Sequence, residues 1–364
     1  DFLNAAVWKW QCQNKIEAHG IKDKVLNWIK AWLSNRKQRV VLNGAMSKWE
    51  DVCSGVPQGS VLGPTLFIVF INDIDNAVDT VNGIIKKFAD DTKVARKVTN
   101  EEKNELQTDI NNLLEWSVEW AMLFNVSKCK IMHIGRSNPC FKYMMDGKDL
   151  IEVSEEKDVG VIMHASLKPS LQCSKAASKA NQVLGQLCRA FKYRDKITFV
   201  RLFVQYVRAH LDYCVQAWCP WTQGDIDVLE NVQRRAIGMV TNFKGRTYEE
   251  KLAEAGMVTL EARRRRGDLL QAYRVLNGVD DVDPQRWFSM AQPRGNVATR
   301  HTGSSLNVER GGGRHDFRRN FWSQRVTDPW NKLPNEVQQA ENLNSFKNGI
   351  DNLLFKRHLA SARP

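Results

Sequence analysis

The sequence has no apolar run approaching the roughly 20 residues that a helix needs to cross a bilayer. Its first residues also lack the basic, apolar and small-residue succession of a signal peptide. Both absences argue against a membrane-spanning or secreted protein, and we predict an intracellular one, nuclear or cytoplasmic, with no membrane partner. The chain begins with Asp1 rather than Met, and we therefore expect a fragment of a longer protein.

Patterns typical of disulfide, zinc and nucleophilic sites are missing as well. The eight Cys residues are scattered, with no CxxC pair and no Cys/His grouping at zinc-finger spacing, so we expect reduced and mostly buried thiols. The seven His residues are isolated, and the sequence contains neither a P-loop nor a local hydrolase signature. Nothing here favours a disulfide scaffold, a zinc finger, a P-loop NTPase or a triad hydrolase.

Positive charge is what the chain has in excess. Lys and Arg number 53 against 41 for Asp and Glu, giving a net charge of +12. This favours a polyanionic partner, nucleic acid first and an acidic membrane surface second. The candidate nucleic-acid contacts are Lys175 and Lys179 on one helix face, and Arg263, Arg264, Arg265 and Arg266, which encircle another helix. Arg can bind phosphate through two parallel hydrogen bonds, but an ordinary exposed basic surface is the alternative.

The stretch Phe88-Ala89-Asp90-Asp91 lies between two apolar, strand-like runs. This pattern predicts a short hairpin with two carboxylates at its tip. Adjacent Asp residues repel each other, and a divalent cation would neutralise the pair. An ordinary Asp-rich turn is the alternative, and these four residues alone favour neither.

Residues 54–64 form a loop rich in Gly and Pro that precedes an apolar helix. Gly55 and Gly59 flank Pro57 and Gln58, so the backbone can approach a ligand closely while Gln58 supplies a polar side chain at the tip. A purely structural loop is the alternative.

A further hairpin is predicted over residues 39–49, because Asn-Gly at 43–44 between two strand-like runs is a strong hairpin pattern. Arg36, Lys37 and Arg39 load its start with positive charge. These side chains fit equally well a solvated edge strand, which Lys and Arg protect from mispairing, and a contact with phosphate.

Helix and strand patterns alternate in the first part of the chain, and helical patterns dominate after residue 170. Thr247 and Glu250 form a capping-box pattern at one helix start. Residues 279–315, rich in Gly, Pro, Ser and Asp, are predicted to be a linker or long loop before a last helix over 341–356. The first helix, from residue 22, is predicted from an apolar face of Val25, Ile29, Trp32 and Leu33.

Taken together, residues 54–64, 88–91 and 125–130 resemble the reverse transcriptases of non-LTR retrotransposons, most closely the jockey-like and chicken-repeat elements. The first motif is similar to the family's template- and nucleotide-positioning loop, and the second to its catalytic acidic turn. Asn125-x-x-Lys128 resembles the following motif, whose Lys is associated with departure of pyrophosphate. Residues 157–161 resemble the strand that leads into the family's thumb, and residues 206–214 and 233–236 resemble the helical region downstream.

The resemblance implies RNA-directed DNA synthesis by two-metal nucleotidyl transfer, with Mg²⁺, or Mn²⁺ in its place, held by Asp90, Asp91 and Asp1. It also implies that Lys128 acts near the leaving pyrophosphate. The implied partners are an RNA template, a DNA primer and deoxynucleoside triphosphates. The residues implied to shape the template and nucleotide pocket are Gly55, Pro57, Gln58, Gly59, Phe88 and Ala89.

The fold implied is α+β: a polymerase palm without fingers over residues 1–160, a helical thumb over 161–278 and an Arg-rich, α-rich C-terminal region over 279–364. The first family motif is altered here, because residues 1–7 keep the first Asp, lose the last, and place Ala6 where an aromatic normally excludes ribonucleotides. We therefore expect this chain to polymerise poorly or not at all. A non-catalytic nucleic-acid-binding remnant and a product without any role are the alternatives.

Overall fold

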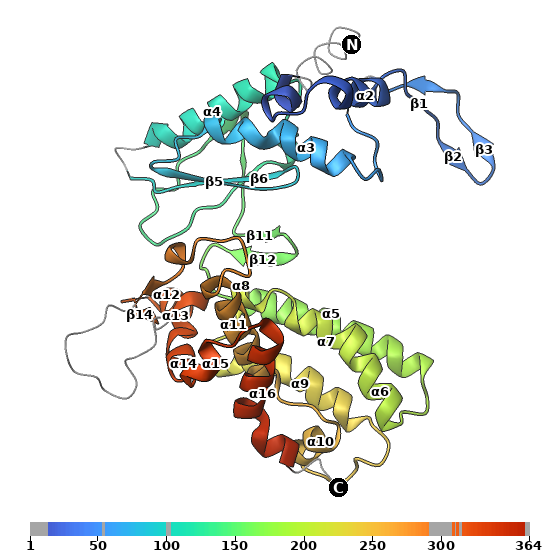
Figure 1. Ribbon diagram of the computed structural model, residues 1–364, viewed down its shortest axis with the longest axis vertical. Coiled ribbons are helices and arrows are strands. Elements are labelled where there is room, and N and C mark those ends of the chain that lie inside the picture. Colours follow the sequence, from blue (N-terminus) through green and yellow to red (C-terminus); the bar gives the residue numbers. More distant parts are fainter. Residues whose placement is uncertain are drawn as a thin grey trace. The chain divides into compact units, whose positions relative to one another are not determined.

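The computed structural model describes residues 14–52, 55–99, 103–290, 308–309, 311–312 and 315–360. The chain divides into two compact units, residues 1–154 (unit 1) and residues 155–364 (unit 2). Helices alternate with short strand pairs in unit 1, whereas helices dominate unit 2, in agreement with the predicted α+β class (Figure 1). Within the described ranges, no helix is both long and apolar enough to span a membrane.

In the described part of unit 1, residues 14–18 are helical and are followed by α2 (Asp23–Leu33), α3 (Gly63–Ile71), η1 (Asn72–Ala77), α4 (Lys103–Glu119) and η2 (Val126–Lys128). The apolar face of α2 is turned by one residue from the predicted face: Leu26, Ile29 and Leu33 are buried, while Val25 is exposed. The spacing i, i+3, i+7 places these three side chains on one stripe, which packs with α3 and with Trp116 of α4.

The strands of unit 1 pair two by two. The β5–β6 hairpin has six residues in each strand, and its Ile85 enters the helical core. The predicted Asn43-Gly44 turn is confirmed, with φ of 49° and 84° as a type I′ turn requires. All pairs are antiparallel except the last of the following: β1 (Lys37–Gln38) with β4 (Glu50–Asp51), β2 (Val41–Leu42) with β3 (Ala45–Met46), β5 (Gly83–Phe88) with β6 (Asp91–Arg96), β8 (Met144–Met145) with β9 (Lys148–Asp149), and β7 (Lys130–Ile131) with β10 (Ile151–Glu152).

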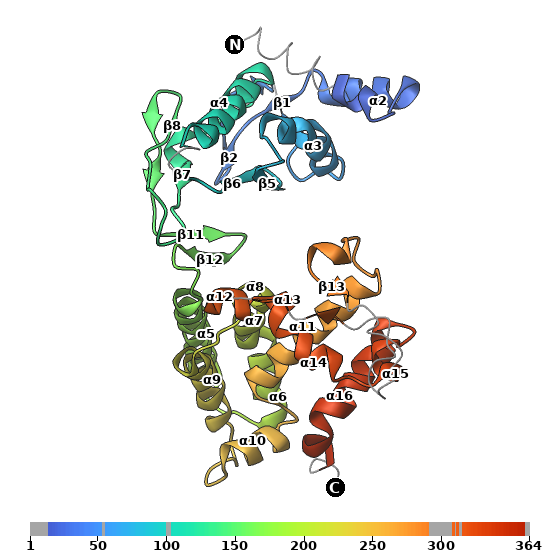
Figure 2. The ribbon, with the colours of Figure 1, turned by 90° about the vertical axis from the view of Figure 1, so that its left-hand side faces the viewer.

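Unit 2 starts with an antiparallel hairpin and continues as packed helices. α5 and α9 lie side by side and bury Ala180, Leu184 and Leu229 between them and their neighbours (Figure 2). The predicted capping box is confirmed, because Thr247 accepts a hydrogen bond from the Glu250 amide and Glu250 accepts one in return. The elements are β11 (Glu155–Asp158), β12 (Val161–His164), α5 (Ser170–Ala190), α6 (Lys196–Leu202), η3 (Phe203–Val207), α7 (Arg208–Asp212), α8 (Val215–Trp218), α9 (Gln223–Gly238), α10 (Tyr248–Glu254) and α11 (Leu260–Leu276).

The segment after α11 folds back onto that helix. Tyr273 of α11 stacks on Phe346 with ring centroids 4.4 Å apart, and the fully buried Trp330 lies beside them. The core of unit 2 therefore continues across residue 279, where the sequence predicted a boundary. The last helix is present as predicted, and the elements are η4 (Pro284–Arg286), β13 (Ser289–Met290), β14 (Val308–Glu309), α12 (Asp316–Arg319), α13 (Trp322–Arg325), α14 (Thr327–Asn331), α15 (Asn335–Gln338) and α16 (Leu343–Ala360).

Candidate active site

The acidic pair lies at the turn between β5 and β6. Phe88 pairs with Asp91 in the hairpin register, which leaves Ala89 and Asp90 as the two turn residues. Ala89 has a φ of +52°, whereas Asp90 is not among the residues with positive φ, as in a type II′ turn. A non-glycine residue there costs on the order of 1–3 kcal/mol, so the surrounding packing must hold the turn in shape.

The hairpin has one covered and one open face. Strand alternation places Ile85 and Lys87 on the covered face and Ile84, Phe88 and Asp91 on the open one. Phe88 is 63% exposed, and Asp91 beside it is exposed as well. A large substrate can therefore reach the acidic pair without any rearrangement of the core.

Lys87 fixes the tip of the hairpin from the covered face. Its ammonium donates to the carbonyl oxygens of Asn72 (2.8 Å) and Ile71 (3.3 Å), at the end of α3, and forms an ion pair with Asp75 at 3.1 Å. Since α3 has nine residues with a rise of 1.5 Å each, roughly 13 Å separate this contact from the glycine loop that precedes α3.

Arg96 fixes the other end of the hairpin to α4. Its guanidinium donates to Asp109 at 2.8 and 3.2 Å and also binds Glu105, and the side chains of Arg96 and Asp109 are each only 3% exposed. The hydrogen bond to Asp109 raises the pKa of Arg96 above its ordinary value. Sequence reasoning missed both anchors; basic residues at covered-face positions of a strand pattern are what would have indicated them.

Asp90 and Asp91 offer the hard oxygen ligands that Mg²⁺ prefers. Among the described residues neither carboxylate has a hydrogen-bond or ion-pair partner, so both oxygens remain available, and this donor set fits a divalent cation. The described part of the chain contains no group of three or more His, Cys, Asp or Glu side chains that could hold a metal. Asp1, the predicted third ligand, lies outside the described residues, as does Ala6.

The glycine loop is shaped by its own hydrogen bonds. Gly55 and Gly59 have φ of +77° and +78°, which explains glycine at both positions. The Ser60 hydroxyl donates to the Pro57 carbonyl at 2.7 Å and accepts from the first amide of α3 at 3.0 Å. Gln58 is exposed at the tip, as predicted from its sequence position.

Lys128 is the last residue of η2, the short helix that follows Asn125. The Lys128 amide donates a hydrogen bond to the Asn125 carbonyl at 2.9 Å. The Lys128 side chain is exposed, and within the described ranges its ammonium has no ion-pair partner. The basic group is therefore available to a phosphate.

The predicted basic contacts of unit 2 differ in exposure. Lys175 and Lys179 are exposed on α5, a helix of 21 residues without a single Asp or Glu. Of the four Arg residues at 263–266 on α11, only Arg265 is exposed, and the side chains of the other three are partly or fully buried. Arg263 forms an ion pair with Asp212 at 2.7 Å, Arg266 forms one with Asp351 at 2.5 Å, and Arg264 is 3% exposed.

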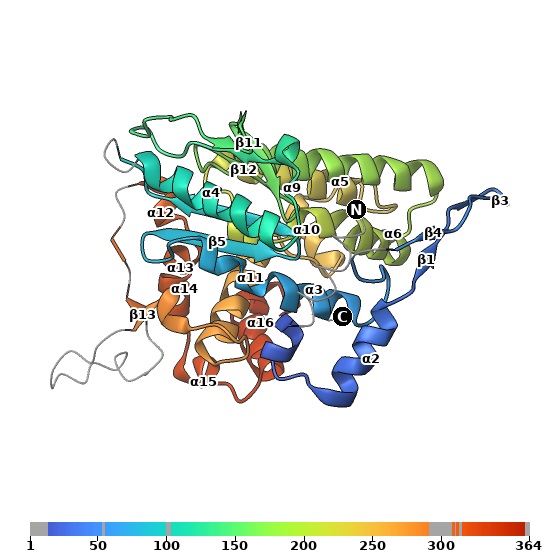
Figure 3. The same ribbon diagram turned by 90° about the horizontal axis from the view of Figure 1, so that it is seen from above.

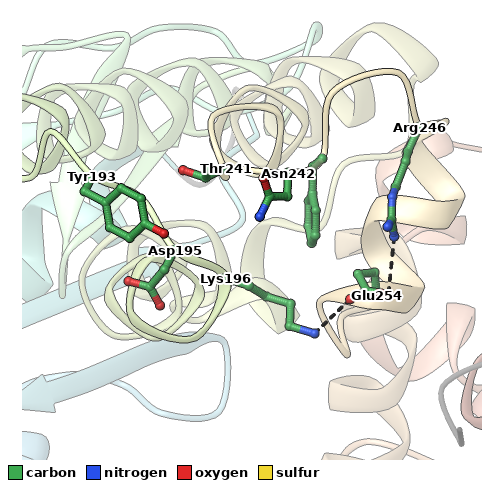
Figure 4. Close-up of a pocket in the computed structure, with 8 residues that line it drawn as sticks. Tyr193, Asp195, Lys196, Thr241, Asn242, Arg246 and Glu254 are labelled. Atoms are coloured by element: carbon green, nitrogen blue, oxygen red, sulfur yellow. Dashed lines mark hydrogen bonds and ion pairs between the residues drawn. The ribbon is translucent and has the colours of Figure 1, made fainter.

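Unit 2 also has a small polar hollow of about 160 Å³, lined by the start of α6, the segment between α9 and α10, and the last residue of α10. There Glu254 accepts from Lys196 at 2.8 Å and from Arg246 at 3.2 Å (Figure 4). The hydrogen bond from Lys196 holds the pKa of Glu254 below its ordinary value. Asp195 also lines the hollow, so its two acidic groups balance Lys196 and Arg246. The hollow therefore holds ion pairs that link helices and is not a candidate phosphate site.

Comparison with known proteins agrees with the resemblance carried by the sequence motifs. A sequence profile described as reverse transcriptase (RNA-dependent DNA polymerase) matches residues 5–185. The match covers 181 of the 364 residues, which are called the reverse transcriptase region below. This reverse transcriptase region contains the glycine loop, the acidic turn, Lys128, and the two exposed lysines of α5.

Individual relatives agree with this resemblance. The chain is similar to the RNA-directed DNA polymerase from mobile element jockey of Drosophila funebris, with 33% identity over 156 residues, 40% of this chain and 17% of that protein. The jockey polymerase of Drosophila melanogaster is 29% identical over 38% of this chain and 16% of its own length. A probable RNA-directed DNA polymerase from transposon BS, from the same fly, is 24% identical over 59% of this chain and 25% of its own. The resemblance to reverse transcriptases of non-LTR retrotransposons is thus confirmed, although the chain spans only a sixth to a quarter of these relatives.

Proposed function

We propose that this chain contributes the catalytic turn and the template-binding surface for RNA-directed DNA synthesis by a mobile element. The observation that carries the proposal is a pair of exposed carboxylates, without a partner among the described residues, at the tip of a hairpin that Lys87 and Arg96 anchor. The finer architecture is part of the same proposal: a palm over residues 1–160, a thumb over 161–278 and a basic C-terminal region over 279–364.

In this proposal Asp90 and Asp91 hold Mg²⁺, with Asp1 as a third ligand. When bound, the cation supplies charge neutralisation at the reacting phosphate. The chain's own residues do the positioning: Phe88 and Ala89 shape the floor beside the carboxylates. Lys128 offers a proximal positive charge for the leaving pyrophosphate.

The template and the deoxynucleoside triphosphate lie against the glycine loop in this account. Gly55, Pro57 and Gly59 allow the loop backbone to approach the ligand closely, and Gln58 presents a polar side chain to the bound strand. The RNA template and DNA primer are further held through their phosphates by Lys175 and Lys179. Of the predicted Arg contacts, Arg265 is the most accessible, and Arg263, Arg264 and Arg266 support the fold that presents it.

The test is primer extension on an RNA template with the full chain, Asp90→Asn and Asp91→Asn. Asp146→Asn is the matched control, because Asp146 is an exposed residue at the turn of another hairpin of unit 1. Because residues 1–7 alter the first motif, the proposal expects weak extension that depends on Mg²⁺, is abolished by the first two substitutions and is unchanged by the third. Extension that survives both substitutions would overturn the assignment of the acidic turn.

A non-catalytic nucleic-acid-binding role is the second candidate, and the acid-free, basic exposed face of α5 favours it. It predicts salt-sensitive RNA binding without extension, independent of Mg²⁺ and unchanged by Asp90→Asn. Lys175→Gln together with Lys179→Gln would then weaken binding and reduce its salt dependence, whereas Asp90→Asn would do neither.

A further inference from the structure

Residues 37–51 form a hairpin arm, made of β1, β2, β3 and β4, that projects from the end of α2 (Figures 1 and 3). Every residue of the arm is exposed, including Val41, Met46 and Trp49 at 55%, 59% and 56%. An isolated two-stranded hairpin is marginally stable in water, and grouped exposed apolar side chains mark a contact surface. The arm therefore has the properties of a surface that a partner covers.

A one-residue bulge organises one face of the arm. The pairs Gln38–Glu50 and Val41–Met46 are separated by two residues on one strand and three on the other. The extra residue lies opposite Arg39, where bulges typically re-aim side chains. As a result the Arg39 guanidinium lies over the Trp49 ring, 4.6 Å from its centroid.

The stacked Arg39 and Trp49 side chains can still bind a further group. Trp49 is 56% exposed, so one ring face remains open beside Arg39. In the described part of the chain, neither the Arg39 guanidinium nor the Lys48 ammonium has a hydrogen-bond or ion-pair partner. Strand alternation puts Arg39, Val41 and, across the arm, Met46 on this face, which we call the Trp49 face, while Glu50 lies on the other.

We propose that the Trp49 face binds a single strand of RNA, with a base stacked on Trp49 and phosphates held by Arg39 and Lys48. An aromatic platform beside unpaired cations is the combination that proteins use for single strands. Residues 36–51 contain four basic and two acidic side chains, which is complementary to a polyanion. A second copy of this chain, with a net charge of +12, would instead be repelled.

The arm is continuous with the glycine loop. At its base, the Arg36 guanidinium donates to the Gly55 carbonyl at 2.6 Å, and the Val52 amide donates to the Arg36 carbonyl at 2.9 Å. A strand that passes the loop is thereby led onto the arm, whose six residues from 37 to 42 extend roughly 20 Å. The inference deepens the proposed function and rests on it for the identity of the strand as template.

The experiment measures binding of a labelled 20-nucleotide single-stranded RNA to the full chain at two salt concentrations, without Mg²⁺ or nucleotides. Trp49→Ala is expected to weaken binding about tenfold, and Trp49→Phe to restore most of it. Arg39→Gln is expected to weaken binding and to reduce the salt slope by about one. Leu42→Ala, which removes an exposed apolar side chain from the other face, is the matched control and should bind as the unaltered chain does.

Equal binding by Trp49→Ala and Leu42→Ala would overturn the inference, as would an effect of Trp49→Ala on sedimentation of the RNA-free chain, since that would indicate a protein partner. Photo-cross-linking of thiouridine-containing RNA to residues 37–51 tests the same contact without any substitution. Because neither assay involves synthesis, loss of binding with Trp49→Ala in a chain that extends no primer would support the arm and count against the polymerase proposal. Unchanged binding with active extension would do the reverse.

Discussion

Units 1 and 2 handle charge in opposite ways. In unit 1 the acidic pair of the β5–β6 turn stays exposed and unpartnered within the described residues, while basic residues beneath it are tied to carbonyls and carboxylates. In unit 2, basic residues form ion pairs within the fold. Arg325, for example, donates two hydrogen bonds of 2.8 Å to Asp268 inside the helical core. A dense Arg run thus marks a stable scaffold here, and a sparse acidic pair marks the candidate site.

The largest effect expected concerns the buried pair of unit 2. Asp268→Ala leaves the Arg325 guanidinium buried without its counter-ion, which costs about 3–5 kcal/mol of unfolding free energy. Chemical denaturation of the full chain measures it. Arg265→Ala, one exposed Arg on the same helix, should change stability by less than about 0.5 kcal/mol. Similar losses for both would contradict the division between structural and exposed Arg.

The two strained hairpin turns offer a sharper comparison. Val159 of the β11–β12 turn has a φ of +42°, and Ala89 of the acidic turn has +52°. Glycine adopts these conformations without strain, so Val159→Gly and Ala89→Gly should each stabilise the chain by about 0.5–1 kcal/mol. Only Ala89→Gly should also lower primer extension, because it loosens the acidic turn. Equal extension by both variants would show that the shape of the Ala89 turn is irrelevant to synthesis.

Thiol reactivity distinguishes core from surface on a smaller scale. Burial raises the pKa of Cys173 to about 12, so its thiol stays protonated at pH 8, and the thiolate is the reactive form. Cys140 of unit 1 and Cys214 of unit 2 are exposed. We expect a thiol reagent to modify these two in the native chain and Cys173 only after unfolding, as peptide mass spectrometry can show. Early modification of Cys173 would mean that the core of unit 2 opens readily.

The smallest effect concerns acid stability. The hydrogen bond from Lys196, and then that from Arg246, holds the pKa of Glu254 below its ordinary value, so this carboxylate stabilises unit 2 above about pH 4.5. The stabilisation is lost as the pH falls through the lowered pKa. Melting temperatures recorded between pH 7 and pH 3 should therefore fall less steeply for Glu254→Gln. An equal fall in the melting temperatures of the unaltered chain and Glu254→Gln would show that the ion pairs of Glu254 contribute nothing measurable.

The sequence predicted the local features of this molecule better than its long-range contacts. Asn43-Gly44, the Thr247 capping box and the acidic hairpin follow from neighbours in sequence, and all three are present. The partners of Arg263 and Arg266 lie 51 and 85 residues away, beyond what any local pattern indicates. The bulge at Trp49 escaped prediction because only the register of both strands reveals it, and the Asp1 motif lies outside the described residues.

The central claim is that the Asp90–Asp91 turn binds the divalent cation. It is tested most directly by counting Mn²⁺ ions bound to the full chain on an RNA–DNA primer-template, by electron paramagnetic resonance. The account predicts that Asp90→Asn combined with Asp91→Asn removes the tightly bound Mn²⁺, while Asp146→Asn retains it. Undiminished Mn²⁺ binding by the double variant would contradict it.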